Sequence, residues 1–350
     1  MKEIAQQLIA WYHQNKRDLP WRNTQDPYKI WLSEIILQQT RVEQGTPYYL
    51  HFIETYPTVF DLANAPEAQV LRSWQGLGYY SRARNLHFAA KEVLAKHKGQ
   101  FPNNYETLIQ LKGVGEYTAA AIASFAFGEA KAVVDGNVFR VLARLFNIAT
   151  PINTGAGKKE FTVLANQFID PKNPALFNQA IMEFGAMQCK PSNPDCSVCP
   201  FNQYCQSFAT NTVSEYPVKS KKTKTRNRYF DFIILSDEKN TILQKREGKD
   251  IWQGLYQFPL IESATKNKNK LDLSKSEVAN YLNTNSHKMV KSSAIVKHVL
   301  SHQVIFAKFW WINMESISTA KDANLIKVPW SHLSDYGMPQ LIVKYLENED

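Results

Sequence analysis

The chain concentrates all of its thiols in one short segment. Its four cysteines lie at Cys189, Cys196, Cys199 and Cys205, with the spacing C-x6-C-x2-C-x5-C. The segment contains prolines and asparagines, which mark turns, and it is too short to have a core, so we expect a metal to order it. Disulfides are disfavoured because nothing in the sequence suggests secretion. Tetrahedral zinc and a [4Fe–4S] cluster both take four thiolates, and the spacing by itself leaves these two open.

Two carboxylates are set among apolar residues in different ways. A helix around Glu34 would place it on one face with Ile30 and Leu37, where lost hydration favours the neutral acid and raises its pKa. Asp135 follows the apolar run 132–134 and is predicted to cap the next helix, whose N-terminus stabilises an anion. One protonated acid beside one charged carboxylate is what glycosidic cleavage requires. The alternatives are that Glu34 reaches solvent from the edge of its stripe and that Asp135 only caps.

A glycine turn separates two helical patterns in the segment LKGVGEYTAA, residues 111–120. Gly113, Val114 and Gly115 are predicted to form it, because glycine lets the backbone bend sharply and approach a ligand closely. The free N–H groups at the start of the following helix would then bind a phosphate without any side chain. Taken alone, the motif fits an ordinary helix hairpin better than a phosphate site.

The elements that position these residues belong to a basic chain of two or three domains. It has 350 residues and a formal net charge of +9, which favours a polyanionic partner such as nucleic acid. No apolar run is long enough to span a bilayer, and the N-terminus lacks the apolar core and cleavage site of a signal peptide. We therefore expect a cytoplasmic protein with no membrane association.

The hydrophobic periodicity changes near residue 220. Up to residue 217, apolar residues recur at three- and four-residue steps, which predicts helices. Residues 219–228 hold six basic residues and no acidic one, so 218–228 is predicted to be a linker, either merely solvated or also touching phosphate. Beyond it, short β-branched and aromatic segments predict an α+β domain. Its strands are expected at 229–235, 241–246, 292–300 and 304–312, and its helices near 274–282 and 340–346.

The motifs together resemble a known family. LKGVGEYTAA, VVDGNVFRVLARLF and the four-cysteine loop, in this order, resemble the endonuclease III superfamily of helix-hairpin-helix DNA glycosylases. Within it, DPYKIWLSEIILQQTRV, GLGYYSRARNLH, WQGLYQFP and HVLSHQ resemble the MutY family of adenine glycosylases, over nearly the whole chain. The resemblance implies a multidomain protein: an all-α glycosylase domain, 1–217, with the hairpin at 105–127 and the cluster loop at 189–205, then an α+β Nudix-like domain, 229–350. It also implies a [4Fe–4S] cluster on the four cysteines.

The function that the resemblance implies is base-excision DNA repair. A monofunctional glycosylase would flip adenine out of double-stranded DNA, where it is mispaired with 8-oxoguanine or guanine, and hydrolyse its N-glycosyl bond. Glu34 matches the acid that protonates adenine, and Asp135 matches the carboxylate that stabilises the oxocarbenium-like sugar. Tyr117 and Asn137 match residues that support this site. The protein is expected to act as a monomer associated with the nucleoid.

The resemblance also implies a DNA-binding set. Trp21 and Arg22 match residues of the adenine pocket, and Ser301 and His302 match the loop that recognises 8-oxoguanine. Gln39, Leu77 and Tyr79 match residues that wedge into the duplex beside the flipped base. The remaining DNA-binding residues are Thr40 and the hairpin residues Gly113, Val114 and Gly115. The chain departs from the family at Lys112, where proline is usual, and at Leu300, where phenylalanine is usual.

Four other functions fit the sequence less well. A glycosylase with lyase activity would have a lysine where Tyr117 stands, and a thymine-mismatch glycosylase usually lacks the second domain. A Nudix hydrolase needs a glutamate-rich metal box, which does not follow Gly254–Tyr256. A non-catalytic iron–sulfur DNA-binding protein would have no need of both Glu34 and Asp135.

Overall fold

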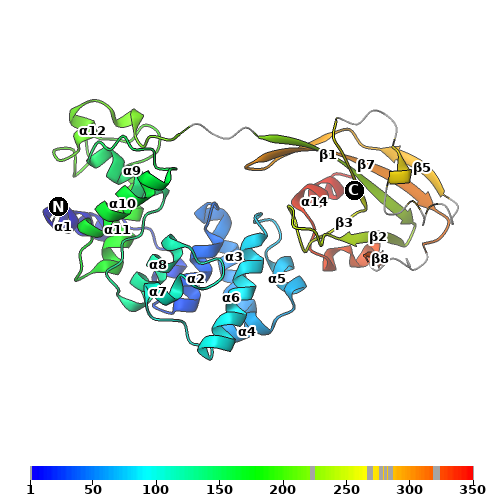
Figure 1. The fold of residues 1–350 in the computed structure, drawn as a ribbon, viewed down its shortest axis with the longest axis horizontal. Coiled ribbons are helices and arrows are strands. Elements are labelled where there is room, and N and C mark those ends of the chain that lie inside the picture. The colour runs from blue at the N-terminus through cyan, green and yellow to red at the C-terminus, as the bar shows by residue number, and fades with distance from the viewer. Residues whose placement is uncertain are drawn as a thin grey trace. The chain divides into compact units, whose positions relative to one another are not determined.

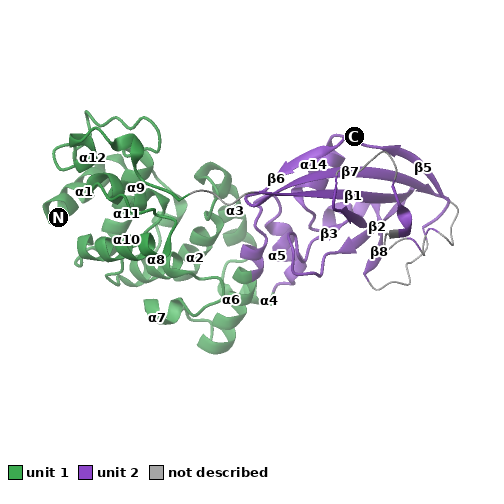
Figure 2. Ribbon diagram, turned by 45° about the horizontal axis from the view of Figure 1, so that its top comes forward, with its two compact units in different colours: residues 1–64, 85–221 green, residues 65–84, 222–350 purple. Residues whose placement is uncertain are grey.

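The structure is a computed structural model in which residues 2–220, 225–265, 271–275, 279, 282, 287–317 and 324–349 are described. Contacts divide the chain into two compact units (Figure 2), the first made of residues 1–64 and 85–221 and the second of residues 65–84 and 222–350. The second unit therefore includes a segment, 65–84, that the sequence analysis assigned to the helical domain.

Regular structure among the described residues of the first unit is helical, which confirms the predicted all-α domain (Figure 1). Its helices are α1 (Lys2–Asn15), α2 (Pro27–Ile36), α3 (Val42–Thr55), α4 (Val59–Asn64), α7 (Tyr105–Leu108), α8 (Glu116–Phe127), α9 (Gly136–Leu145), α10 (Gly155–Phe168), α11 (Pro174–Met187) and α12 (Gln206–Ala209), with 3-10 turns η1 (Pro20–Arg22) and η2 (Val213–Glu215). Helix α5 (Glu67–Ser73) belongs to the second unit, and α6 (Ser81–His97) begins there and ends in the first.

Helix α2 is buried on nearly all sides. Asp26 accepts a 2.9 Å hydrogen bond from the Tyr28 N–H and Pro27 occupies the first turn, so the helix begins where the sequence predicts. Eight of its ten residues are buried. It packs against α8, whose alanines allow a close approach. A glutamate in the last turn of α2 is consequently enclosed by protein.

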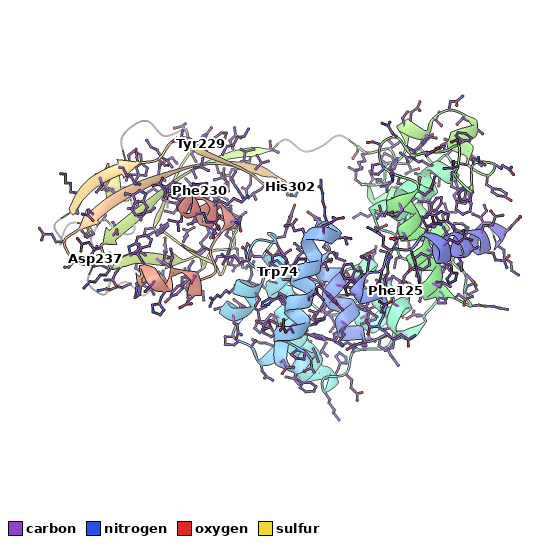
Figure 3. The ribbon with its side chains drawn as sticks, turned by 180° about the vertical axis from the view of Figure 1, so that it is seen from behind. Trp74, Phe125, Tyr229, Phe230, Asp237 and His302 are labelled. Carbon is purple, nitrogen blue, oxygen red and sulfur yellow. The ribbon has the colours of Figure 1, made fainter. Side chains whose placement is uncertain are left out.

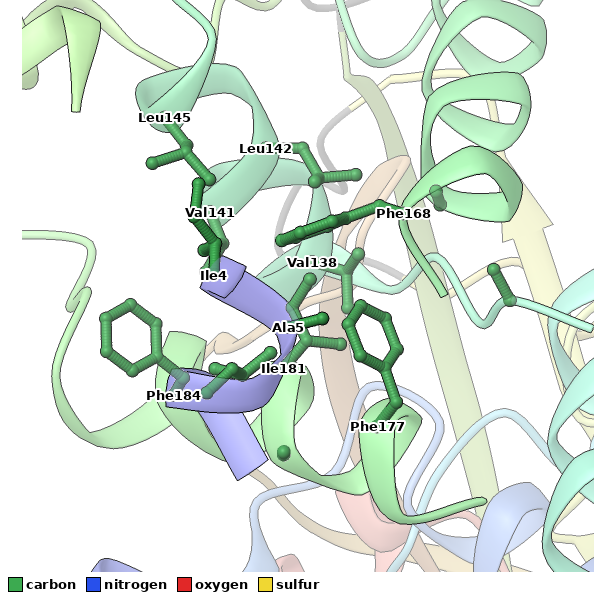
Figure 4. Close-up of a cluster of buried hydrophobic side chains, with 14 of the residues drawn as sticks. Ile4, Ala5, Val138, Val141, Leu142, Leu145, Phe168, Phe177, Ile181 and Phe184 are labelled. Atoms are coloured by element: carbon green, nitrogen blue, oxygen red, sulfur yellow. The ribbon is translucent and has the colours of Figure 1, made fainter. Parts of the chain in front are cut away.

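One apolar core fixes α9. Its residues Val138, Val141, Leu142 and Leu145 follow helical spacing and form one face. That face packs against apolar side chains of α1 and α11 (Figure 4), which include Ile4, Ala5, Phe177, Ile181 and Phe184. Burial of each large side chain contributes about 1.5–3 kcal/mol. The N-terminus of α9, where Asp135 lies, is thereby held in place.

The second unit contains a mixed sheet. Strands β1 (Arg226–Asp237) and β7 (Gln303–Met314) pair in parallel, from Arg226 opposite Gln303 to Ser236 opposite Asn313. The antiparallel partners are β2 (Asn240–Lys245) and β4 (Leu260–Ser263) on β1, β3 (Tyr256–Gln257) and β8 (Leu325–Pro329) on β2, and β5 (His287–Ser292) and β6 (Val296–Val299) on β7. Tyr345 of α14 (Gln340–Glu347) stacks on Phe309 of β7, with 3.6 Å between ring centroids. Short 3-10 turns, η3 (Leu273–Lys275) and η4 (Trp330–Asp335), complete the unit.

The predicted α+β character of this unit is confirmed. Three predicted strands fall in β1, β2 and β7, and the helix predicted near 340–346 is α14. The strand predicted at 292–300 is β6 in its second half, while its first residue ends β5. The helix predicted near 274–282 lies largely outside the described residues. Strand β1 begins at Arg226, so the last three residues of the predicted linker 218–228 are strand, because they pair with the start of β7. Among the described helices, none is long and apolar enough to cross a membrane.

Candidate active site

Glu34 lies near the C-terminal end of α2 with 8% of its surface exposed. Burial raises the pKa of Glu34 from 4.5 to about 7, and the nearby Asp135 adds to the rise. The Tyr117 hydroxyl, which donates a hydrogen bond to the Glu34 carboxyl, opposes it. The Arg22 guanidinium opposes it as well. Tyr117 stands in the first turn of α8, and burial beside Glu34 raises its pKa well above 10, so it stays a donor. The raised pKa expected of Glu34 is confirmed, and a large share of molecules carries it protonated at neutral pH.

Asp135 caps α9 as predicted. Its Oδ1 accepts hydrogen bonds from the N–H groups of Asn137 at 2.9 Å and Val138 at 2.8 Å, and its Oδ2 accepts one from Asn137 Nδ2 at 2.7 Å. These hydrogen bonds favour the anion, as expected of a helix cap, and lower the pKa of Asp135. Burial raises that pKa by more, so the net pKa lies above its usual 3.8. The bonds still favour the anion, and they aim the carboxylate.

Asn137 is held by Arg140, a residue that the sequence analysis missed. Arg140 Nη2 donates to Asn137 Oδ1 at 2.8 Å, and its Nε donates to the Cys189 carbonyl at 2.7 Å. A chain of hydrogen bonds therefore links the cysteine loop to Asp135. The only sign of Arg140 in the sequence is a charged residue in the apolar run VFRVLARL, which also fits a solvated helix face.

Trp21 and Arg22 lie on η1, and Arg22 is close to two buried acids, Glu34 and Glu183. Arg17 and Arg22 each place an Nη2 2.7 Å from Oε2 of Glu183, whose side chain is fully buried. Burial pushes the pKa of Glu183 up, but the hydrogen bonds from the two arginines outweigh it and lower that pKa to about 2. The Trp21 ring packs edge-on against Tyr49, 5.4 Å between centroids. Glu183 thus anchors Arg22 close enough to Glu34 to act on its pKa.

The turn between α7 and α8 has the geometry that its glycines predict. Gly113 has a φ of 78°, and a Cβ built there would lie 2.6 Å from Cβ of Asn85, so this position requires glycine. Val114 is buried, and Gly115 caps α8 with open space beside its Cα. The first N–H groups of a helix have no partner within it. A phosphate can therefore approach those of α8 from the side of Gly115.

Gln39 and Thr40 follow α2. Gln39 is exposed and has a φ of 56°, in the left-handed region that few residues other than glycine adopt. The Thr40 hydroxyl donates to the Gln38 carbonyl at 3.3 Å. The Gln39 side chain accordingly stands at the tip of a tight turn.

The second unit gathers four other predicted residues around one cavity of about 380 Å³. Leu77 and Tyr79, from the segment 65–84, and Ser301 and His302, from the turn between β6 and β7, all line it. The hydroxyls of Tyr79 and Ser301 are hydrogen-bonded to each other. Tyr79 is 43% exposed with a φ of 47°, whereas Leu77 is 6% exposed. Tyr79 is therefore accessible at the rim of the cavity, and Leu77 is a wall of it.

The four cysteines surround a cavity of their own beside α9 and α11. Cys189, Cys196, Cys199 and Cys205 all line it, together with Arg144, Phe184 and Phe201. Arg144 Nη1 donates to Cys189 Sγ at 3.5 Å. No group of three or more His, Cys, Asp or Glu side chains in the described part of the chain is arranged to hold a single metal ion. Four thiols around a common space can together bind a metal group, and a cationic donor stabilises thiolate ligands.

Comparison with known protein families gives separate matches for the helical part of the chain, the α+β part and the cysteine loop. Residues 32–166 match the HhH-GPD superfamily of base excision DNA repair proteins, and residues 232–348 match the NUDIX domain. Residues 189–205 match the iron–sulfur binding domain of endonuclease III. This match settles the choice that the spacing left open: the four cysteines form a site for a [4Fe–4S] cluster.

Curated relatives and solved structures agree with these matches. The adenine DNA glycosylase of Buchnera aphidicola subsp. Baizongia pistaciae is 34% identical over 97% of this chain and 95% of its own, and that of Homo sapiens is 46% identical over 57% and 38%. A thermostable thymine-DNA glycosylase is similar at a TM-score of 0.56 and 30% identity, over 60% of this chain and 96% of that one. An endonuclease III–DNA complex, at 0.52 and 22% identity over 60% and 95%, shares the fold.

Proposed function

Because the chain belongs to the adenine DNA glycosylase family, whose enzymes hydrolyse N-glycosyl bonds in base-excision repair, we propose that it removes adenine mispaired with 8-oxoguanine or guanine. It would act as a monomer on double-stranded DNA in the nucleoid. The observation that carries the proposal is the pair of buried carboxyls: Glu34, whose pKa is about 7, and Asp135, which three N–H groups hold at the start of α9.

Glu34 is the general acid in this proposal. Adenine is a poor leaving group as an anion, so it must gain a proton as the glycosidic bond breaks. A carboxyl with a pKa near the working pH is both protonated often enough and acidic enough to supply that proton, an effect worth about 10²–10⁴-fold. Tyr117 fixes the orientation of the carboxyl through its hydrogen bond.

Asp135 stabilises the cationic sugar that remains. Its carboxylate is aimed by Asn137 and Val138, so a fixed negative charge stands ready for the positive charge that develops on the sugar. Tyr117 stands where a lyase would have its lysine. This supports a monofunctional enzyme that leaves an abasic site.

The base must leave the stack before this chemistry can occur. Gln39 and Tyr79 are exposed on left-handed turns, which supports their entry into the duplex, where side chains help offset an unstacking cost of a few kcal/mol. Leu77 would have to leave its buried position to take part. The amides at the start of α8 would hold a phosphate of the same strand.

Ser301 and His302 are proposed to read the base opposite adenine. 8-Oxoguanine differs from guanine by an N7–H donor and an O8 acceptor, and a serine hydroxyl with its backbone groups can both accept and donate. Ser301 lines the cavity of the second unit and is exposed. This arrangement supports recognition of the lesion edge by the turn between β6 and β7.

The substrate is tested with the full-length protein on duplexes carrying A:8-oxoguanine, A:G, A:T and G:T, in single turnover with and without alkali. We expect strand breaks only after alkali, from the first two duplexes, with the 8-oxoguanine duplex faster. Thymine release from the G:T duplex would favour the activity of the thymine-DNA glycosylase that the first unit resembles. Breaks without alkali would show a lyase.

Exchanging Ser301 and His302 for alanine is expected to lower the preference for 8-oxoguanine over guanine. Each good polar contact to a base edge is worth about 1–3 kcal/mol of discrimination, so the ratio of the two single-turnover rates should fall by about tenfold or more. The matched control changes His287 and Ser292, which are exposed on β5 outside the cavity. A ratio that stays at the wild-type value in the Ser301/His302 variant would refute this assignment.

Cys199→Ser is expected to give protein without the visible absorbance of an iron–sulfur cluster and with low solubility, because three thiolates no longer hold the group that orders the loop. The control, Val198→Ser, adds the same side chain at a neighbouring position that is 69% exposed. It should keep the absorbance. Purified wild-type protein with stoichiometric zinc and no such absorbance would overturn the cluster assignment.

A further inference from the structure

Arg228 is a heavily hydrogen-bonded side chain of the second unit that the proposed mechanism does not use. It lies near the start of β1 with 7% of its surface exposed. Its guanidinium makes paired hydrogen bonds with Asp250, at 2.8 and 2.7 Å, and with Glu262, at 2.7 and 2.6 Å. The guanidinium also lies over the ring of Phe230, 4.8 Å from its centroid. Two bidentate carboxylates on one planar cation give fixed geometry as well as energy.

The charges around Arg228 balance. Arg246 Nη2 is 2.7 Å from Asp250 Oδ2, so two arginines face two carboxylates. The pairing raises the pKa of Arg228 and lowers that of Asp250. Asp250 and Glu262 already neutralise the two arginines, so a DNA phosphate is not required to do so. Arg228 is therefore not a phosphate contact of the kind the basic linker could have provided.

Two partners of Arg228 line the cavity that Ser301 and His302 also line. Asp250 belongs to the loop 250–254, of which residues 250–252 are cavity wall. Gln303 follows His302 directly, also lines the cavity, and places its Oε1 3.4 Å from Arg228 Nη1. Glu262 stands on β4 and does not line the cavity. The guanidinium thus bridges the loop wall and the end of the Ser301–His302 turn.

We propose that Arg228 is a positioning residue for lesion recognition: by tying the loop 250–252 to the start of β7, it sets the spacing between the cavity wall and Ser301. This inference rests on the proposed function of Ser301 and His302. The Arg84 side chain, which donates to the Gln253 carbonyl, holds the same loop from the segment 65–84. Arg246 holds the loop as well, through Asp250 and the Ile251 carbonyl. Of the three arginines that hold the loop, Arg228 is the one that also contacts Gln303 at the end of the Ser301–His302 turn.

Arg228→Lys tests the proposal because it keeps the charge and removes the bridge. A lysine ammonium is a point charge that cannot form two parallel pairs of bonds. We expect the ratio of single-turnover rates on A:8-oxoguanine and A:G duplexes to fall about tenfold, with the rate on A:G within about twofold of wild type. Glu262→Gln should lower the ratio in the same direction by about threefold, although Glu262 does not line the cavity.

The control is Asp237→Ala at the far end of β1. Asp237 accepts hydrogen bonds from the N–H groups of Asn240 and Ile317, so its loss weakens the same unit, and Figure 3 shows it at the opposite end of the sheet from His302. Thermal unfolding of each variant gives the loss of stability. The rate ratio should stay at the wild-type value in Asp237→Ala. An equal fall in that variant would mean that general weakening of the unit, and not Arg228, lowers the ratio.

The experiments distinguish failure of the Arg228 proposal from failure of the proposed function of Ser301 and His302. If exchanging Ser301 and His302 lowers the ratio but Arg228→Lys and Glu262→Gln do not, the positioning role of Arg228 is refuted and the proposed function stands. If wild-type protein shows no preference between the two duplexes, the proposed function of the turn fails first. Should Arg228→Lys not fold, Glu262→Gln decides: an unchanged ratio overturns the proposal, and a lowered one supports it.

Discussion

Glu34→Gln is expected to slow adenine release by about 10²-fold or more in single turnover, because an amide has nearly the shape of the acid but cannot donate the proton. Binding to the A:8-oxoguanine duplex should be unchanged, since Glu34 is buried and the change removes no exposed charge. The measurements are the single-turnover rate and the dissociation constant on the same duplex.

The control for this variant is Glu54→Gln, an exposed glutamate on α3. It should leave both quantities at their wild-type values. A Glu34→Gln protein that released adenine at a near wild-type rate would assign the proton transfer to another group.

Asp135→Asn is expected to lower the rate of adenine release by about 10²–10³-fold, the usual effect of removing one preorganised electrostatic contact to a charged transition state. Asparagine is as good a helix cap as aspartate, so α9 should keep its start. The variant therefore separates charge from structure, apart from the one hydrogen bond with Asn137 Nδ2.

Asp26→Asn is the matched control, because Asp26 caps α2 in the same manner at the end of the helix remote from Glu34. It should keep full activity. Equal rates for Asp135→Asn and wild type, with unfolding temperatures also equal, would remove the carboxylate from the mechanism.

Local features of this chain could be predicted because neighbouring residues determine them. The start of α2 depends on Asp26 and Pro27, and the turn before α8 depends on Gly113. The cap of α9 depends on Asp135. The cysteine cavity could be expected because its four ligands are close in sequence.

Contacts between distant segments could not be predicted in this way. Glu183 anchors Arg22 across 161 residues, and Tyr79 bonds Ser301 across 222. Arg228 was assigned to a linker because its sequence neighbours are basic, whereas its carboxylate partners lie 22 and 34 residues away. The net pKa of Asp135 could not be predicted for the same reason: the helix cap is local, but burial comes from the packing of other helices.

The pH dependence of adenine release tests the central claim most directly. A buried acid with a pKa of about 7 is protonated below that pH and loses its proton above it. The single-turnover rate of the full-length protein on an A:8-oxoguanine duplex should therefore fall above pH 7, approaching about tenfold for each further unit. Protonation of Asp135, whose pKa burial raises above its usual 3.8, should lower the rate again at more acidic pH. In Glu34→Gln the fall above pH 7 should be absent. A wild-type rate that is constant or rises between pH 7 and 9 would contradict proton donation by Glu34.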